Sequence, residues 1–384
     1  MNRLAAIARA AVLACVTSSA ALGTGCLFSE VVHQEADAGA PDATELDAAI
    51  ADAPLDAPWP DAAPLTNGVD TIAGSGEPGA ADGNRAVARF DNPVNVVRAP
   101  DGTLYVADFN NGRIRVIDTE GIVDTLPAPP GFARPFGLAL AADGTLYVET
   151  DDNELGEHRA DTGTIWAVDT ANGITTMIAH DLGRPRGLAV LADGRIVMSD
   201  PDFHTVSLLD PYTGLVTHLA GKSGFPGYAN GNGSAARFNR PYGVAVRSDG
   251  KIIVADYGNN VIRLVATWGE VFLYAGAGEE GARDGEGSLA QFAKPQDVAL
   301  DADDNVYVAD SANFLVRKIS SANVVTTLAG DGVGGHRDDL DPRHARFFGL
   351  EGLDVAPDGT VFLADGNRGE DGPYHRVRRI TPTD

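Results

Sequence analysis

Two oxygen-bearing side chains interrupt a column of the sequence that is otherwise glycine, and a third stands directly beside that column. When the chain is aligned on a register that returns six times, the column contains Asn95 and Asp297, and Glu351 stands one residue before Gly352 of the same column. Amide and carboxylate oxygens are the ligands that a hard cation such as Ca²⁺ prefers. The three residues therefore predict a site for Ca²⁺ or another divalent cation. The alternative is that Asn and Asp occupy turn positions where glycine is also favoured.

A second group of carboxylates interrupts the same register. The run from Glu149 to His158 places Thr150 where the other five repeats keep an aspartate. Dense carboxylates bind calcium, but this run lacks the glycine hinge and the spaced ligands of an EF-hand loop. A solvated acidic loop is therefore the simpler interpretation. His158, and His375 at the end of a matching insertion, are the candidates for a catalytic acid or base.

Four basic residues directly precede prolines at the starts of repeats. They are Arg134, Arg184, Arg240 and Lys294. A ring of positive charge in an acidic protein would attract carboxylate or phosphate groups, so we predict that these residues bind a ligand. The alternative is that they pair with neighbouring acidic loops.

The register that aligns these residues has a glycine-like position, an Asp six residues later and, in five of its six copies, another Asp seven residues after that. Its middle members are Asp101, Asp143, Asp193, Asp249, Asp303 and Asp358. Self-similarity at about 40–55 residues indicates a repeat architecture. In the fourth unit, residues 241–246 and 252–256 read as two strands joined by the Asp249-Gly250 turn, and two more strands follow. Four antiparallel strands form one propeller blade.

The sixth unit shows only three strands, the last at residues 375–380. Residues 69–74, before the first unit, match residues 325–330, which form the fourth strand of the fifth unit. A strand from before the first blade that completes the last one would close the ring and remove two exposed sheet edges. We therefore predict an all-β, six-bladed β-propeller closed by an N-terminal strand.

This pattern resembles the NHL-repeat propellers, which share a TolB-like plan. The resemblance rests on the run at 236–243, the Asp-Gly turn, Val254-Ala255-Asp256, Asn259-Asn260 with Ile262-Arg263, and Leu328-Ala329-Gly330. It covers about residues 69–380. Propellers of this type include binding scaffolds, lyases and lactonases, so the resemblance implies a fold and no single activity.

A second resemblance concerns the predicted metal ligands. Gluconolactonase-like propellers hold their metal with a Glu, an Asn and an Asp, and Glu351-Gly352 looks like the Glu-Gly that opens a blade there. This resemblance implies the alternative function, a metal-dependent hydrolase or lactonase with its site at the channel mouth. A histidine such as His158 or His375 would then carry the proton.

Two segments precede the predicted propeller of residues 68–384. Residues 1–26, with Arg3, Arg9 and an apolar stretch before Cys26, resemble a lipoprotein signal whose cysteine carries the lipid. An ordinary cleaved secretory signal is the alternative. Residues 27–67 are rich in Ala, Asp and Pro, with nine acidic residues and no Lys or Arg, which predicts a disordered acidic tether.

The composition of the chain excludes several classes of function. The formal net charge of −25 argues against nucleic-acid binding, which requires a basic surface. The two cysteines, Cys15 and Cys26, precede the propeller, which excludes a disulfide, a thiolate metal site or a catalytic cysteine there. We therefore expect an exported monomer, either an outer-membrane lipoprotein or a periplasmic or cell-surface protein, that touches the membrane only through its lipid. Its expected role is a non-catalytic scaffold for a protein, a small molecule or a glycan.

Overall fold

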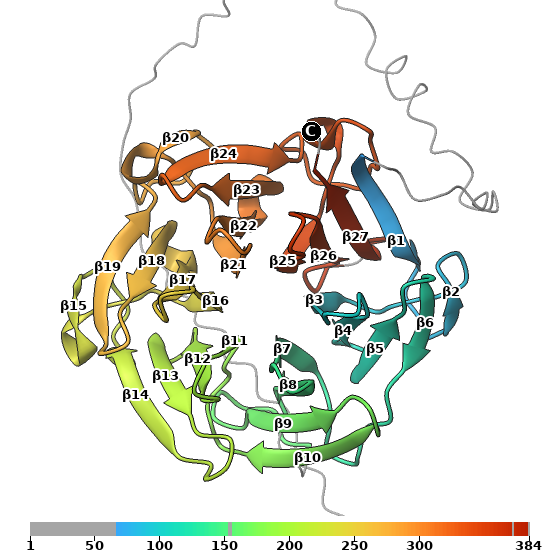
Figure 1. The fold of residues 1–384 in the computed structure, drawn as a ribbon, viewed down its shortest axis with the longest axis horizontal. Coiled ribbons are helices and arrows are strands. Elements are labelled where there is room, and N and C mark those ends of the chain that lie inside the picture. The colour runs from blue at the N-terminus through green and yellow to red at the C-terminus, as the bar shows by residue number, and fades with distance from the viewer. Residues whose placement is uncertain (1–66, 153–155, 371, 383–384) are drawn as a thin grey trace, which may run out of the picture. The chain divides into compact units, whose positions relative to one another are not determined.

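The computed structural model describes residues 67–152, 156–370 and 372–382. They form six β-sheets arranged as a ring (Figure 1), which confirms the predicted six-bladed, all-β propeller. The predicted signal and nearly all of the acidic tether lie outside the described residues. In the described part of the chain, no helix has the length and hydrophobicity needed to span a bilayer.

The first three blades are built from β2 to β14. Blade 1 contains β2 (Gly83–Asn84), β3 (Pro93–Arg98), β4 (Leu104–Asp108), β5 (Arg113–Ile117) and β6 (Ile122–Thr125). Blade 2 contains β7 (Pro135–Leu140), β8 (Thr145–Thr150), β9 (Thr164–Asp169) and β10 (Ile174–Ala179). Blade 3 contains β11 (Gly187–Val190), β12 (Ile196–Asp200), β13 (Thr205–Leu209) and β14 (Val216–Gly221).

The last three blades follow the same plan. Blade 4 contains β15 (Gly231–Asn232), β16 (Pro241–Val246), β17 (Ile252–Asp256), β18 (Val261–Val265) and β19 (Glu270–Ala275). Blade 5 contains β20 (Gly285–Glu286), β21 (Pro295–Leu300), β22 (Val306–Asp310), β23 (Leu315–Ile319) and β24 (Val324–Ala329). Blade 6 contains β25 (Gly349–Val355), β26 (Val361–Gly366), β27 (His375–Thr381) and β1 (Gly68–Gly76). Short 3-10 helices lie at η1 (Gly233–Ala235), η2 (Tyr257–Asn259), η3 (Gly287–Leu289), η4 (Ser311–Asn313) and η5 (Pro342–His344).

The turn between the first two strands of each blade defines one face of the ring. In blade 4, Asp249 Oδ1 accepts a hydrogen bond from the amide of Lys251 at 3.1 Å. Gly250 between them has a φ of 79°, a left-handed conformation that costs glycine least. We call the face with these turns the hairpin face. The opposite face, where the inner strands begin, is the linker face.

A buried aspartate–arginine pair recurs in blades 1, 4, 5 and 6. In blade 4, Asp256 and Arg263 are both fully buried, with Oδ2 and Nη1 3.0 Å apart. The same guanidinium donates to the carbonyls of Arg237 and Ala229 and lies 5.4 Å from the ring of Phe238. The equivalent pairs are Asp108–Arg115, Asp310–Arg317 and Asp365–Arg378. Each pair therefore fastens the linker that enters a blade to that blade, and these recurring aspartates are structural.

Blades 2 and 3 depart from this scheme. Blade 2 has Thr150 and Trp166 in place of the pair, and the indole N–H donates to Thr150 Oγ1 at 3.0 Å. Blade 3 keeps its aspartate, but Ser207 stands opposite Met198 where blade 4 has Arg263 opposite Val254. Among the described residues, these two sheets also have no two-residue fifth strand like those of blades 1, 4 and 5.

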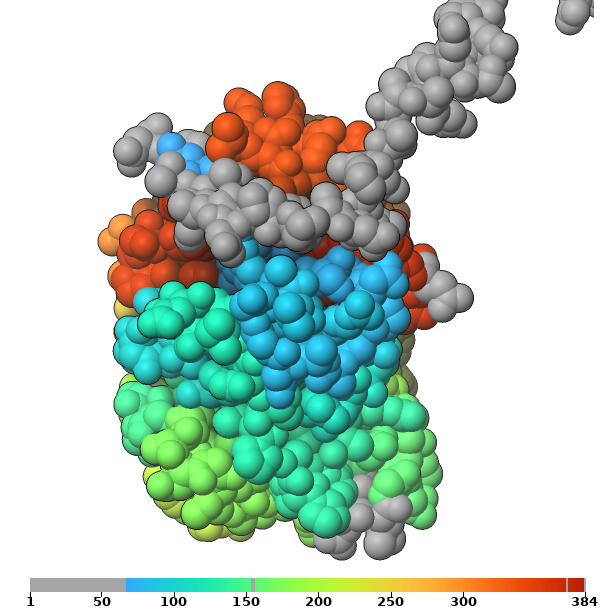
Figure 2. Space-filling model, turned by 90° about the vertical axis from the view of Figure 1, so that its right-hand side faces the viewer, coloured from blue at the N-terminus to red at the C-terminus, as the bar shows by residue number. Residues whose placement is uncertain are grey.

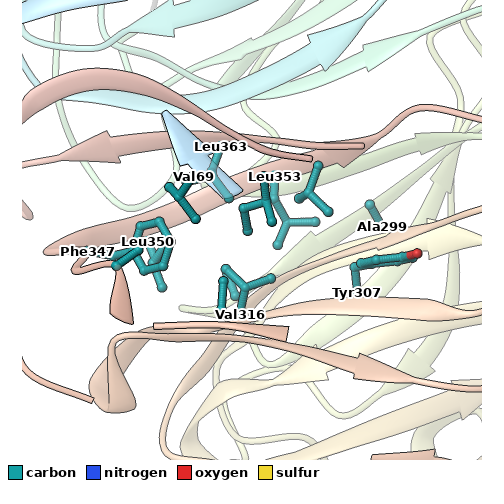
Figure 3. Close-up of a cluster of buried hydrophobic side chains, with 13 residues drawn as sticks. Val69, Ala299, Tyr307, Val316, Phe347, Leu350, Leu353 and Leu363 are labelled. Carbon is teal, nitrogen blue, oxygen red and sulfur yellow. The ribbon is translucent and has the colours of Figure 1, made fainter. Parts of the chain in front are cut away.

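The N-terminal strand closes the ring as predicted. β1 pairs antiparallel with β27, from Gly68 opposite Thr381 to Gly76 opposite His375. Val69 packs with Leu353 and Leu363 of blade 6 and with side chains of blade 5 (Figure 3). Figure 2 shows the blue N-terminal segment beside the orange-red C-terminal blade at this side of the ring. Blade 6 is therefore assembled from both ends of the propeller.

Candidate functional site

A cavity of about 700 Å³ occupies the centre of the ring at the hairpin face. Its walls come from the inner strands, and turn residues such as Asp143 lie at its mouth. Asn95 and Asp297 both line it, so the structure brings two of the three predicted metal ligands to one space. Asp354, which the sequence analysis did not single out, lines it as well.

The polar groups of this cavity are bonded to backbone amides. Asp297 Oδ2 accepts from the amide of Leu353 at 2.9 Å, and Asp354 Oδ2 accepts from the amide of Arg98 at 2.6 Å. These bonds link blade 5 to blade 6 and blade 6 to blade 1. Burial raises the pKa of Asp297 to about 7 and that of Asp354 to about 6, because the charged form loses hydration.

Glu351, the third predicted metal ligand, has different surroundings. It is 8% exposed, its Oε2 accepts from Gln296 Nε2 at 3.4 Å, and it is not among the residues that line the 700 Å³ cavity. Burial raises its pKa to about 7, against the opposing charges of Arg368 and Arg186. Successive residues of a strand point to opposite sides, which explains why Glu351 does not share the surroundings of the column that contains Asn95.

No group of three or more His, Cys, Asp or Glu side chains in the described part of the chain is arranged to hold a metal ion. A set that includes an asparagine amide is not covered by that statement. The divalent cation at Asn95, Asp297 and Glu351 therefore stays a prediction.

Glu351 belongs to a second ring of six residues, one from each blade, directly before the glycine column. The six are Val94, Phe136, Arg186, Tyr242, Gln296 and Glu351. None of them lines the 700 Å³ cavity. The guanidinium of Arg186 lies 4.1 Å from the centroid of the Phe136 ring, within reach of a cation–π interaction. This ring stands nearer to the linker face than the cavity does.

Blades 2 and 3 bring four charged residues together at this ring, three of them buried and Arg184 partly exposed. We call Glu149, Asp151, Arg184 and Arg186 the blade 2–3 cluster. Asp151 is fully buried and accepts from Arg184 Nη2 at 3.1 Å and from Arg186 Nη2 at 3.0 Å. Glu149 is also fully buried, and its Oε1 has no hydrogen-bond partner among the described residues. Burial and then repulsion from Asp151 raise the pKa of Glu149 well above its usual range.

The sequence carried a signal for this cluster. Glu149 lies on the second strand of its blade, opposite the glycine column of the first strand. At the equivalent position, the other five blades have small residues. These are Ala107, Ser199, Ala255, Ala309 and Ala364. Arg186 stands in the column of Glu351, which an alignment shifted by one residue would have shown. Five blades therefore fold without a carboxylate at this place, and the cluster is not required by the repeat.

The two predicted acid–base histidines are held differently. His158 Nδ1 lies 2.9 Å from Asp152 Oδ1, and its side chain is 39% exposed. His375 is 2% exposed, and its Nδ1 accepts from the amide of Asn92 at 2.8 Å. Burial lowers the pKa of His375. His375 thus joins blade 6 to blade 1 as a neutral imidazole, and a catalytic role for either histidine stays a prediction.

The four predicted ligand-binding basic residues divide into two kinds. Arg134 lies 3.4 Å from Asp152, and Arg184 pairs with Asp151 of the blade 2–3 cluster. Arg240 and Lys294 are exposed, and neither forms an ion pair within the described residues. Both cations therefore lack a counter-ion among the described residues, although the Arg240 guanidinium donates to the Tyr242 hydroxyl and lies near the rings of Tyr242 and Tyr257.

Comparison with known proteins identifies a family whose repeat matches parts of this chain. The model of the NHL repeat matches residues 90–117 and 292–319. Protein SUPPRESSOR OF QUENCHING 1, chloroplastic, from Arabidopsis thaliana is 26% identical over 283 residues, which are 65% of this chain and 27% of that protein. NHL repeat-containing protein 2 from Bos taurus is 33% identical over 124 residues, which are 30% of this chain and 17% of that protein. The chain thus spans less than a third of the length of either relative.

A solved structure shows the same fold. The structure described as an auxiliary nutrient binding protein from Bacteroides thetaiotaomicron has a TM-score of 0.63 and 18% identity, and the match covers 81% of this chain and 75% of that chain. At this identity the likeness concerns the fold alone. Together with the six sheets of the ring, it shows that this chain is a six-bladed β-propeller, and the two matched segments show that it contains NHL repeats.

Proposed function

We propose that this protein is an exported, envelope-tethered and non-catalytic scaffold that binds a protein, a small molecule or a glycan at its linker face. The observation that carries the proposal is the blade 2–3 cluster. Burying charged groups is costly unless they are paired, and five of the six blades fold without a carboxylate at the position of Glu149. The blade 2–3 cluster is therefore a departure from the repeat that costs folding free energy, and it lies beside the inner ends of the blades. This combination favours a role in recognition over a role in folding.

Two exposed cations also favour ligand binding at the linker face. Arg240 and Lys294 stand at equivalent places in blades 4 and 5, each with a left-handed backbone, at φ of 55° and 52°. Arg240 also donates to the hydroxyl of Tyr242, which belongs to the inner ring, at 3.1 Å. Positive groups on an acidic protein attract acidic or hydroxyl-bearing ligands. The description of the Bacteroides structure as nutrient binding offers a precedent for a propeller of this shape in binding.

The test is an array of glycans and peptides, probed with the full-length protein and two double variants. Arg240→Ala with Lys294→Ala is expected to weaken binding by about tenfold or more. Arg195→Ala with Lys251→Ala removes the same two residue types from the hairpin face, where they pair with Asp193 and Asp249, and should leave binding unchanged. Equal losses in both variants, or metal-dependent turnover of esters or lactones by the purified protein, would contradict the proposal.

Tethering is tested separately through Cys26. If this cysteine carries a lipid, the natural protein should partition into the detergent phase of an envelope extract, and Cys26→Ala should move to the aqueous phase. The array measurement does not depend on this result. Aqueous partitioning of both proteins would mean that residues 1–26 act as an ordinary secretory signal.

A further inference from the structure

We propose that the 700 Å³ cavity at the hairpin face is a second binding site, which takes a small organic cation: a primary ammonium group attached to a flat apolar body. This inference is independent of the proposed function, which concerns the opposite face. It rests on how polar residues are distributed around the inner strands, on two carboxylates that form no ion pair within the described residues, and on the space in front of them.

The first step is the asymmetry of the cavity wall. Residues two apart on a strand share a face, so two columns of the inner strands face the centre of the ring, and all of their residues except Gly137, Gly243 and Gly352 line the cavity. The first column holds Asn95, Gly137, Gly187, Gly243, Asp297 and Gly352, and the second holds Val97, Ala139, Ala189, Ala245, Ala299 and Asp354. The three polar residues come from blades 1, 5 and 6. Because β25 contacts both β3 and β21, these blades are neighbours, and the cavity has one polar wall opposite a wall of glycine and alanine.

The second step is charge. No Lys, Arg or His nitrogen of the described residues lies within ion-pair distance of Asp297 or Asp354. Asp297 is influenced by burial, by the amides of Leu353 and Val298, and by repulsion from Asp354, and not by any cation. The charged side chains that line the cavity are Asp143, Asp297 and Asp354 against Arg98 alone. The charge of Arg98 acts on Asp354, but neither carboxylate is held in an ion pair. Partly buried carboxylates without a paired counter-ion are unfavourable, and a cationic ligand would supply one.

The third step is a free donor. Asn95 is 9% exposed and lines the cavity. Its carbonyl accepts from the amide of Val96 at 2.8 Å, while its amide group donates no hydrogen bond within the described residues. Asn95 Nδ2 is not among the fully buried atoms without a partner, so this donor is open to the cavity that Asn95 lines. A hydroxyl or ether oxygen on the ligand, or a water molecule beside it, would satisfy the Asn95 amide.

The fourth step is space and access. A volume of about 700 Å³ is within the usual range for small-molecule sites. Ala189 and Ala245 leave room for an apolar body opposite the carboxylates. Tyr147 and Tyr212 also line the cavity, and Tyr212 is 87% exposed, so the cavity reaches the surface of the hairpin face. Aromatic rings at the entrance favour a cation attached to an apolar group.

Titration calorimetry with phenethylamine and with its neutral counterpart, phenethyl alcohol, tests the inference on the full-length protein. The amine is expected to bind at least about tenfold more tightly than the alcohol. Asp297→Asn with Asp354→Asn should abolish that preference. Asp124→Asn with Asp161→Asn changes two exposed carboxylates elsewhere and should preserve it.

A second variant keeps the inference testable if the double Asn variant does not fold. Ala245→Leu fills the cavity and leaves both carboxylates in place, so amine binding should weaken by about tenfold, while ligand binding at the linker face should be unchanged. Equal affinity for amine and alcohol, no measurable binding of the amine, or binding of Ca²⁺ that excludes the amine would overturn the inference.

Discussion

Replacing Arg263 by leucine is expected to lower the free energy of unfolding by about 3–5 kcal/mol. The substitution leaves the Asp256 carboxylate fully buried without its counter-ion. It also removes the bonds to the carbonyls of Arg237 and Ala229 and to the side chain of Asn230. Buried polar groups that lose their partners keep the full cost of their desolvation. Urea unfolding followed by circular dichroism measures the change.

Blade 3 provides the matched control for this prediction. Ser207 occupies the position of Arg263 there, so Ser207→Ala should change the unfolding free energy by no more than about 1 kcal/mol. Loss of the linker contact should also expose residues 222–240 to proteolysis in Arg263→Leu. If both variants unfold at the same urea concentration as the natural protein, the pair does not fasten the linker.

Replacing Asp297 by asparagine is expected to make the protein increasingly more stable than the natural protein as the pH rises. The pKa of Asp297 is raised from 3.8 to about 7 in the folded protein. The folded state therefore retains a proton that the unfolded state releases, and this group's contribution to stability is present below about pH 4 and is lost as the pH rises through 7. Asparagine does not ionise. Relative to the natural protein, the variant should gain on the order of 3–4 kcal/mol between pH 4 and pH 8, at about 1.4 kcal/mol per pKa unit.

Asp301→Asn is the control for the direction in which stability changes with pH. Against the opposing effect of burial, hydrogen bonds from Asn305 and Tyr307 lower the pKa of Asp301. Its contribution to stability is therefore present above the unfolded pKa and lost as the pH falls, so this variant should be the less stable protein at neutral pH. Thermal unfolding from pH 4 to pH 8 distinguishes the two. A difference between Asp297→Asn and the natural protein that stays constant with pH would show that Asp297 titrates normally.

The fold was predictable because one register repeats six times without insertion between its two anchor positions. Each Asp-Gly turn fixes where two strands meet, and the match of residues 69–74 to residues 325–330 showed how the ring closes. The two-residue strands β2, β15 and β20 were not predictable. A pairing of two residues has no periodicity that a sequence pattern can show.

The candidate sites were predictable only in part. The glycine column located Asn95 and Asp297, which the structure places in one cavity. Asp354 was missed because the column two residues later was not compared, although residues two apart share a face. The blade 2–3 cluster was missed because its members come from one strand and two loops, and the pairing of Asp151 with Arg184 and Arg186 depends on blade packing. A single sequence does not show which residues of neighbouring blades lie opposite each other.

The pairing of β1 with β27 has a consequence for biosynthesis. Asp70 and Arg379, which meet across this pair, are 309 positions apart. Closing so long a loop costs entropy and delays folding, and β1 has no strand to pair with until β27 has been synthesised. A nascent chain that stops before this point would keep unpaired strand edges, which are templates for aggregation. Chains that lack β27 therefore remain accessible to chaperones and proteases. In chains that contain β27, its pairing with β1 covers these strand edges.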